Sequence, residues 1–150
     1  MALRGAFDDL ALPAADYLPV VAVTTTAQAS GVAPVAGFAG AQQNVLVSSA
    51  ATALTTPTAA QIYAQFVSAL QLAGLANPGQ NTALSAGILG SSYIVEIVNS
   101  DASGLTLTAG TGVTFVGTNV IAAAAGSRTY AVNIVSPTVV TMTSIGSGGI

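Results

Sequence analysis

The part of the sequence that follows residue 80 alternates between two faces with a period of two residues. The clearest segment is residues 92–99 (SYIVEIVN), in which Tyr93, Val95 and Ile97 fall on one face and Glu96 on the other. A period of two is typical of a β-strand, because successive side chains of a strand point to opposite faces of the sheet. We therefore expect this chain to build its core from strands.

One segment before the expected helix is rich in β-branched residues, and shorter alternating segments follow one another between turn residues after residue 100. Further strands are expected over residues 44–52, 105–108, 113–116, 119–122, 128–135 and 138–145. Many short strands between turn signals favour an antiparallel sandwich or barrel. No repeat of about 20–50 residues is present, so a solenoid is not expected. We predict a mainly β fold, an antiparallel, jelly-roll-like β-sandwich with one α-helix.

The helix is expected over residues 58–73. Thr58 and Gln61 have the spacing of a capping box, in which each side chain bonds the other residue's backbone N–H. Ile62 and Phe66 then recur at helical spacing and define the apolar face of the helix.

The first 40 residues differ from the rest in composition. They hold four of the seven charged residues and three of the six prolines. We predict an extended N-terminal arm over residues 1–40 and a β-sandwich domain over residues 41–150. Residues 17–26 are β-branched and read as one strand, which Pro19 restricts to a sheet edge. An arm that packs on a neighbouring subunit and a partly disordered leader both fit this segment.

Charged side chains are scarce throughout the chain. The seven are Arg4, Asp8, Asp9, Asp16, Glu96, Asp101 and Arg128, which is 5% of the 150 residues, against about 25% in an ordinary domain. Histidine, cysteine and lysine are absent, so the commonest general base, the most reactive nucleophile and the soft metal ligands are missing. We expect no enzyme, no catalytic residues, no cofactor and no metal.

Two local motifs resemble ligand sites but lack residues that such sites require. Asp8 and Asp9 are adjacent, but no carboxylate follows within the next six residues, as a calcium loop would require. The glycines Gly110 and Gly112 are followed by an expected strand and not by the helix of a phosphate-binding loop. A tight hairpin turn is the expected structure there.

The net charge of the chain limits the classes of partner that it can bind. The net charge is −3 and the two arginines lie far apart in the sequence, which argues against nucleic acid and against an anionic membrane surface. No apolar run reaches the ~20 residues of a spanning helix, and acidic residues interrupt any N-terminal signal sequence. We expect a soluble protein made in the cytoplasm.

Glu96 is the one charge inside the clearest strand. It lacks the second carboxylate that glycoside hydrolysis needs, whereas Arg128 opens a neighbouring expected strand. We hypothesise a structural ion pair between Glu96 and Arg128, within a subunit or across an interface. Tyr63 and Tyr130 are expected to be core or interface aromatics with their hydroxyls at the rim.

A monomer of this size cannot cover its surface with seven charges. Its exterior must consist of small uncharged residues and some apolar ones, and large apolar patches mark association sites. We therefore expect a homo-oligomer, or a subunit of a larger assembly.

Three stretches carry a resemblance to a known class of proteins. They are Thr58-Ala-Ala-Gln61, Ile97-Val-Asn99, and the run LTLTAGTGVTFVG over residues 105–117, followed by a closing strand pair over residues 130–145. This pattern resembles a domain common among virion proteins of tailed bacteriophages, namely capsid decoration (cement) proteins and head-fibre components. The resemblance covers about the last 90 residues and implies a trimeric β-sandwich on the outside of the head.

The resemblance implies a structural function. A cement protein would be made in the host cytoplasm, form a homotrimer on the capsid surface and stabilise contacts between major capsid subunits, with the arm as an anchor. The alternatives are a phage tail-fibre or baseplate subunit and a carbohydrate-binding β-sandwich module.

Overall fold

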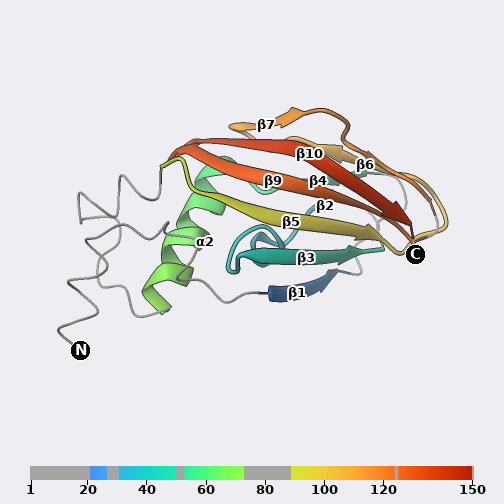
Figure 1. Ribbon diagram of the computed structural model, residues 1–150, viewed down its shortest axis with the longest axis horizontal. Coiled ribbons are helices and arrows are strands. Elements are labelled where there is room, and N and C mark those ends of the chain that lie inside the picture. The colour runs from blue at the N-terminus through green and yellow to red at the C-terminus, as the bar shows by residue number, and fades with distance from the viewer. Residues whose placement is uncertain (1–20, 27–30, 50–52, 73–88, 124, 150) are drawn as a thin grey trace.

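The computed structural model describes residues 21–26, 31–49, 53–72, 89–123 and 125–149. These residues form a mainly β structure of two mixed sheets with one α-helix, α2 (Ala59–Leu72) (Figure 1). In the described part of the chain, no helix is long and apolar enough to cross a membrane.

The larger sheet has six strands and the smaller has four. In spatial order the larger sheet contains β1 (Val21–Thr26), β3 (Gln43–Ser48), β5 (Ser92–Asn99), β9 (Gly126–Ser136), β10 (Val139–Gly149) and β7 (Val113–Val116). The smaller sheet contains β2 (Gly31–Val32), β4 (Ala53–Thr55), β6 (Leu105–Thr108) and β8 (Val120–Ile121). The strands expected from the period of two are confirmed, although the one expected over residues 44–52 ends at Ser48 and a separate β4 follows.

The chain winds between the two sheets. From β1 to β6 each strand is followed by one in the opposite sheet, so β1, β3 and β5 are parallel neighbours in one sheet and β2, β4 and β6 in the other. A strand in the opposite sheet thus supplies the crossover that parallel pairing requires. The expectation of antiparallel, jelly-roll-like pairing is therefore wrong for this part of the chain.

This winding amounts to three turns of a solenoid-like coil, which the sequence did not indicate. Val21 lies beside Gln43, but Gln43 lies beside Ile94, because α2 is inserted between the second and third turns. The unequal turns leave no fixed sequence period to detect.

Antiparallel pairing is present in the C-terminal half. β9 pairs with both β5 and β10, and β6 pairs with β8. β9 and β10 form a long hairpin across the front of Figure 1. The register of this hairpin shifts between Val139 and Val140 at the start of β10 and between Ser144 and Gly146 in its middle, and each shift marks a β-bulge or irregularity.

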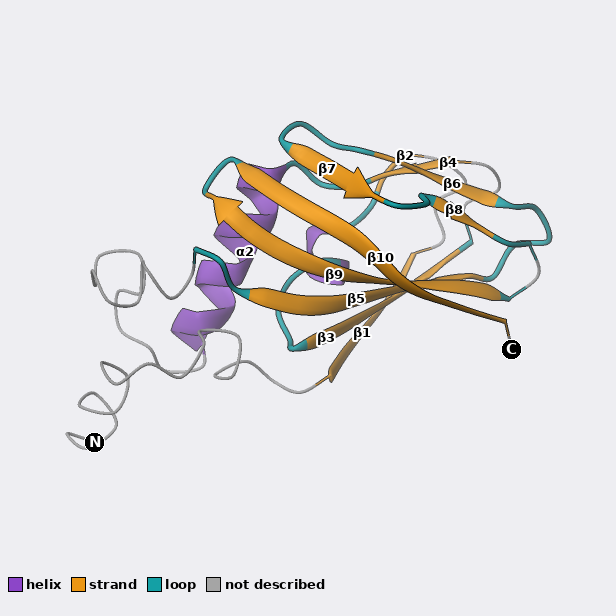
Figure 2. Cartoon of the chain, turned by 45° about the horizontal axis from the view of Figure 1, so that its top comes forward, coloured by secondary structure: helices purple, strands orange, loops and turns teal. Residues whose placement is uncertain are grey.

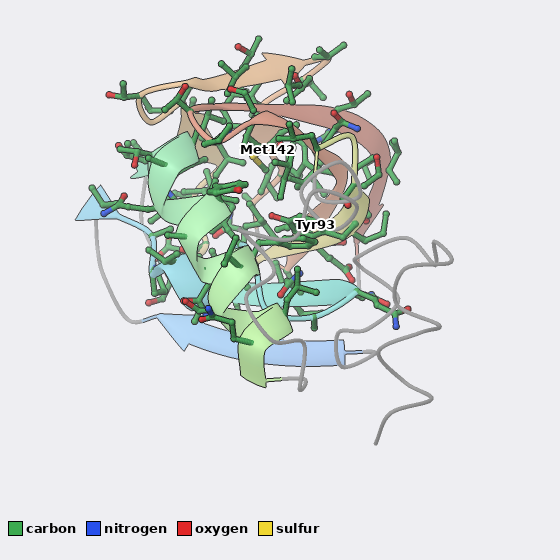
Figure 3. The ribbon with its side chains drawn as sticks, turned by 90° about the vertical axis from the view of Figure 1, so that its left-hand side faces the viewer. Tyr93 and Met142 are labelled. Atoms are coloured by element: carbon green, nitrogen blue, oxygen red, sulfur yellow. The ribbon has the colours of Figure 1, made fainter. Side chains whose placement is uncertain are left out.

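One hydrophobic core fills the space between the sheets. The buried side of β5 carries Tyr93, Val95 and Ile97, as the alternation predicted. The small sheet contributes leucines of β4 and β6, and β10 contributes Met142. Figure 3 shows Tyr93 and Met142 among the side chains near α2.

Helix α2 lies across one end of the strands (Figure 2). Its capping box is confirmed: the Thr58 N–H donates to Gln61 Oε1 at 2.9 Å, and the Gln61 N–H donates to Thr58 Oγ1 at 3.2 Å. The predicted apolar face is also confirmed, since Ile62 and Phe66 are fully buried. The Phe66 ring stacks on Tyr93 with centroids 5.5 Å apart, which joins the helix to the large sheet.

The described part of the predicted arm belongs to the folded unit. β1 is an edge strand, as expected, and pairs with β3. Phe38 and Ala39 are fully buried, and the Phe38 carbonyl accepts a 2.6 Å hydrogen bond from the Tyr93 hydroxyl. The boundary predicted at residue 40 therefore falls inside the fold. Residues 1–20 lie outside the described part, and their anchoring role stays a prediction.

The loop with Gly110 and Gly112 is not the hairpin turn that we expected. It carries the chain from β6 in the small sheet to β7 in the large sheet. A side chain at Gly110 would meet the carbonyl oxygens of Thr56 and Pro57 at 2.5 Å, and Gly112 has a positive φ of 79°. These glycines let the loop approach the start of α2, where the Gly110 N–H donates to Thr56 Oγ1 at 2.9 Å.

Candidate functional site

The outer face of the large sheet is formed by the sheet with the most described strands, six against four. This outer face consists of the side chains of β3, β5, β9 and β10 that point away from the core. Register aligns them in rows: Gln43, Ile94, Ala131 and Thr143; then Val45, Glu96 and Thr129; then Val47, Val98 and Ser127. All of these side chains are half-buried. In Figure 1 no other described helix or strand lies in front of this face.

The described residues include only three charged side chains, Glu96, Asp101 and Arg128. Each is half-buried, so no fully exposed residue in the described ranges is charged. The exposed surface is made of small polar and apolar side chains instead. Its large apolar members are Val32, Leu89, Val116, Val120, Val135, Val139 and Ile145, which is 56% exposed. Single exposed apolar residues are normal on a protein surface, so the unusual feature of the described surface is its shortage of charge.

Glu96 lies in the middle row of the outer face. Its cross-strand neighbours are Val45 on β3 and Thr129 on β9, and Ile94 and Val98 flank it along β5. Its carboxylate makes no hydrogen bond or ion pair with any residue in the described ranges. The site is therefore a single carboxylate surrounded by β-branched side chains.

Arg128 lies on the opposite side of the same sheet. It is directly opposite Ile97, a core residue, whereas Glu96 is opposite Thr129. Its Nε donates to the Val120 carbonyl at 2.8 Å, and its Nη1 donates to Ser144 Oγ at 3.1 Å. The structure therefore does not bring Glu96 and Arg128 together within one chain. Pairing between copies stays a prediction.

The tyrosines serve the core. Tyr130 is fully buried and donates its hydroxyl to the Thr118 carbonyl at 3.2 Å. Burial raises the pKa of Tyr130 to about 12, although the positive charge of Arg128 acts in the opposite direction. Burial also raises the pKa of Tyr93. Tyr63 is half-buried and packs against the core.

Two buried asparagines, whose structural role was not predicted, bond the connections between strands. Asn99, at the end of β5, donates to the carbonyls of Ser103 and Ala122 at 2.6 and 3.1 Å. Asn44, near the start of β3, donates to the Ala41 carbonyl at 2.9 Å. Both satisfy backbone carbonyls where the chain leaves or enters the large sheet. The position of each asparagine at the edge of an apolar run was a sequence signal for a buried, hydrogen-bonded strand end.

The structure offers no other assembled site in the described ranges. No three acidic side chains come together there as metal ligands would. Asp8 and Asp9 lie outside those ranges. Comparison with known proteins adds no assignment: no family model matches the chain, and no similar curated protein or solved structure was found.

Proposed function

We propose that this chain is a structural protein of a virion, a capsid decoration protein that trimerises on the outside of a tailed-phage head. In this role it stabilises contacts between major capsid subunits and catalyses no reaction. The observation that carries the proposal is the shortage of charge on the exterior of the described residues, combined with a wide half-buried sheet face. Such surfaces suit permanent coverage by neighbouring subunits.

The mechanism is passive. A protein that binds the assembled shell, and not the separate capsid subunits, stabilises the shell by mass action. Burial of apolar surface at the contact supplies the favourable free energy, because removal of apolar surface from water is favourable. The proposed site of action is the capsid surface, after synthesis in the host cytoplasm.

The test is to mix the purified chain with heads of the encoding phage that lack it. We expect a trimer by native mass spectrometry, and ordered density on the head surface by cryo-electron microscopy. Decorated heads should also resist heating better than bare heads. A monomer that leaves the heads undecorated would refute the proposal.

A tail-fibre or baseplate role predicts density on the tail instead, so the same micrographs distinguish the two. A carbohydrate-binding module has less support. Such modules present exposed aromatic rings, and every aromatic side chain in the described ranges is buried or half-buried.

A further inference from the structure

We propose that the outer face of the large sheet is the surface that contacts the capsid, and that Glu96 receives an arginine or lysine side chain of the capsid protein. This inference rests on the proposed function. It adds the face, the residue and the chemistry of the partner.

The shape and chemistry of the face limit what it can bind. Apart from Glu96, the three central rows contain only valine, isoleucine, alanine, threonine, serine and glutamine side chains. A largely uncharged face of this kind gains free energy by excluding water from its apolar side chains. Its single charge then sets the position and orientation of the partner, because charged groups at interfaces contribute more to specificity than to affinity.

A covered Glu96 requires a cation. Removal of water from an unpaired carboxylate is strongly unfavourable, and a guanidinium or ammonium group offsets that cost. A guanidinium fits best, since it can form two parallel hydrogen bonds with the carboxylate. No described residue supplies the cation, because Arg128 lies on the other side of the sheet and is bonded to Val120 and Ser144.

A second copy of the chain fits this face poorly. A two-fold contact centred on it would bring Glu96 close to the Glu96 of the other copy, and like charges repel. A head-to-tail contact, as in the proposed trimer, would instead require a cation on the surface of the second copy that covers Glu96. The described part of a second copy also has no cation other than Arg128. The remaining cation of the sequence, Arg4, lies outside the described residues, and it is tested directly below.

The experiment measures binding to heads of the encoding phage prepared without this chain. The variants are Glu96→Gln, which keeps the size of the side chain, and Glu96→Lys, which reverses its charge. Asp101→Asn is the matched control, because it removes the same charge from the β5–β6 loop. Arg4→Gln tests the chain's own cation. Binding is followed by co-sedimentation at two salt concentrations, with thermal unfolding and native mass spectrometry as checks.

We expect Glu96→Gln to raise the Kd for heads by about tenfold to a hundredfold. Glu96→Lys should abolish binding, and Asp101→Asn should bind within about twofold of the wild type. The salt dependence should weaken in Glu96→Gln, because an ion pair is lost. All variants should remain folded and keep the oligomeric state of the wild type.

The outcomes separate this inference from the proposed function. If the wild type fails to bind heads, the proposed function is refuted. If the wild type and Glu96→Gln bind equally well, capsid decoration stands and the role of Glu96 is refuted. If Glu96→Gln and Arg4→Gln both dissociate the oligomer, the outer face contacts a second copy and the inference is overturned.

Discussion

The hydrogen bond between Tyr93 and Phe38 ties the segment before β3 to the centre of the large sheet. The Tyr93 side chain is 3% exposed and Phe38 is fully buried, so the change Tyr93→Phe leaves a buried carbonyl without its donor. Loss of such a partner costs about 1–2 kcal/mol. For a chain of this length we expect a decrease in Tm of roughly 3–6 °C.

Thermal and urea unfolding measure this effect, and Tyr63→Phe is the control. Tyr63 is only half-buried on α2, and no hydrogen bond joins its hydroxyl to another described residue. We expect Tyr63→Phe to change the free energy of unfolding by less than about 0.5 kcal/mol. Equal stability of wild type and Tyr93→Phe would show that the Phe38 segment is not anchored to the core in this way.

The wild type and Tyr93→Phe also test how the free energy of unfolding depends on pH. Burial raises the pKa of Tyr93, so the folded state keeps the phenol protonated at a pH where the unfolded state ionises. Stability is therefore fully present below about pH 10 and falls as the pH rises above it. Each buried tyrosine contributes a slope of up to about 1.4 kcal/mol per pH unit. Tyr93→Phe should have the shallower slope, and identical slopes would contradict a buried hydroxyl.

Three further changes test separate parts of the fold. Thr58→Ala removes the side-chain cap of α2 and should cost about 1 kcal/mol in thermal unfolding; an unchanged Tm would mean that the capping box does not stabilise the helix. Gly112→Ala places a side chain against the Thr138 carbonyl at a positive φ and should cost about 2 kcal/mol or more in urea unfolding, whereas a neutral effect would exclude the tight loop. Glu96→Thr should raise the free energy of urea unfolding by up to about 1 kcal/mol, because threonine suits a β-branched sheet face. A destabilised Glu96→Thr would indicate an intramolecular partner for the carboxylate.

The strands and the helix were predictable from local sequence patterns. Side chains of a strand alternate whichever partner it pairs with, so residues 92–99 identified β5 and its buried face. The capping box at Thr58 and Gln61 identified the start of α2 to within one residue. Both signals depend on neighbours in sequence and need no knowledge of the fold.

The pairing of strands was not predictable in the same way. Turn residues at 99–104 and 109–112 show where the chain changes direction, but the same residue types serve a hairpin and a crossing to another sheet. Which one forms depends on contacts far away in sequence, such as those of Gly110 with Thr56 and Pro57. The expected antiparallel pairing failed for this reason.

The separation of Glu96 from Arg128 could have been foreseen. Glu96 has the opposite parity to the buried residues of β5, whereas Arg128 shares the parity of Tyr130 and Val132, the more apolar side of β9. Adjacent strands of one sheet share their inner face, so the two charges had to fall on opposite sides whatever the register. The odd or even position of each charge along its strand therefore predicts that Glu96 and Arg128 lie on opposite sides of the sheet.

The different environments of Arg128 and Glu96 are relevant to function. Arg128 faces inward, where its hydrogen bonds to Val120 and Ser144 link β9 with β8 and β10, so the fold itself accounts for it. Glu96 faces outward without a partner among the described residues, in a strand whose other outward residues are apolar or uncharged. If Glu96→Thr stabilises the isolated protein yet releases it from phage heads, the carboxylate serves recognition and not folding. If neither the folding of the protein nor its binding to heads requires the Glu96 carboxylate, the outer face has no polar group that selects its partner. The contact would then depend on apolar area alone.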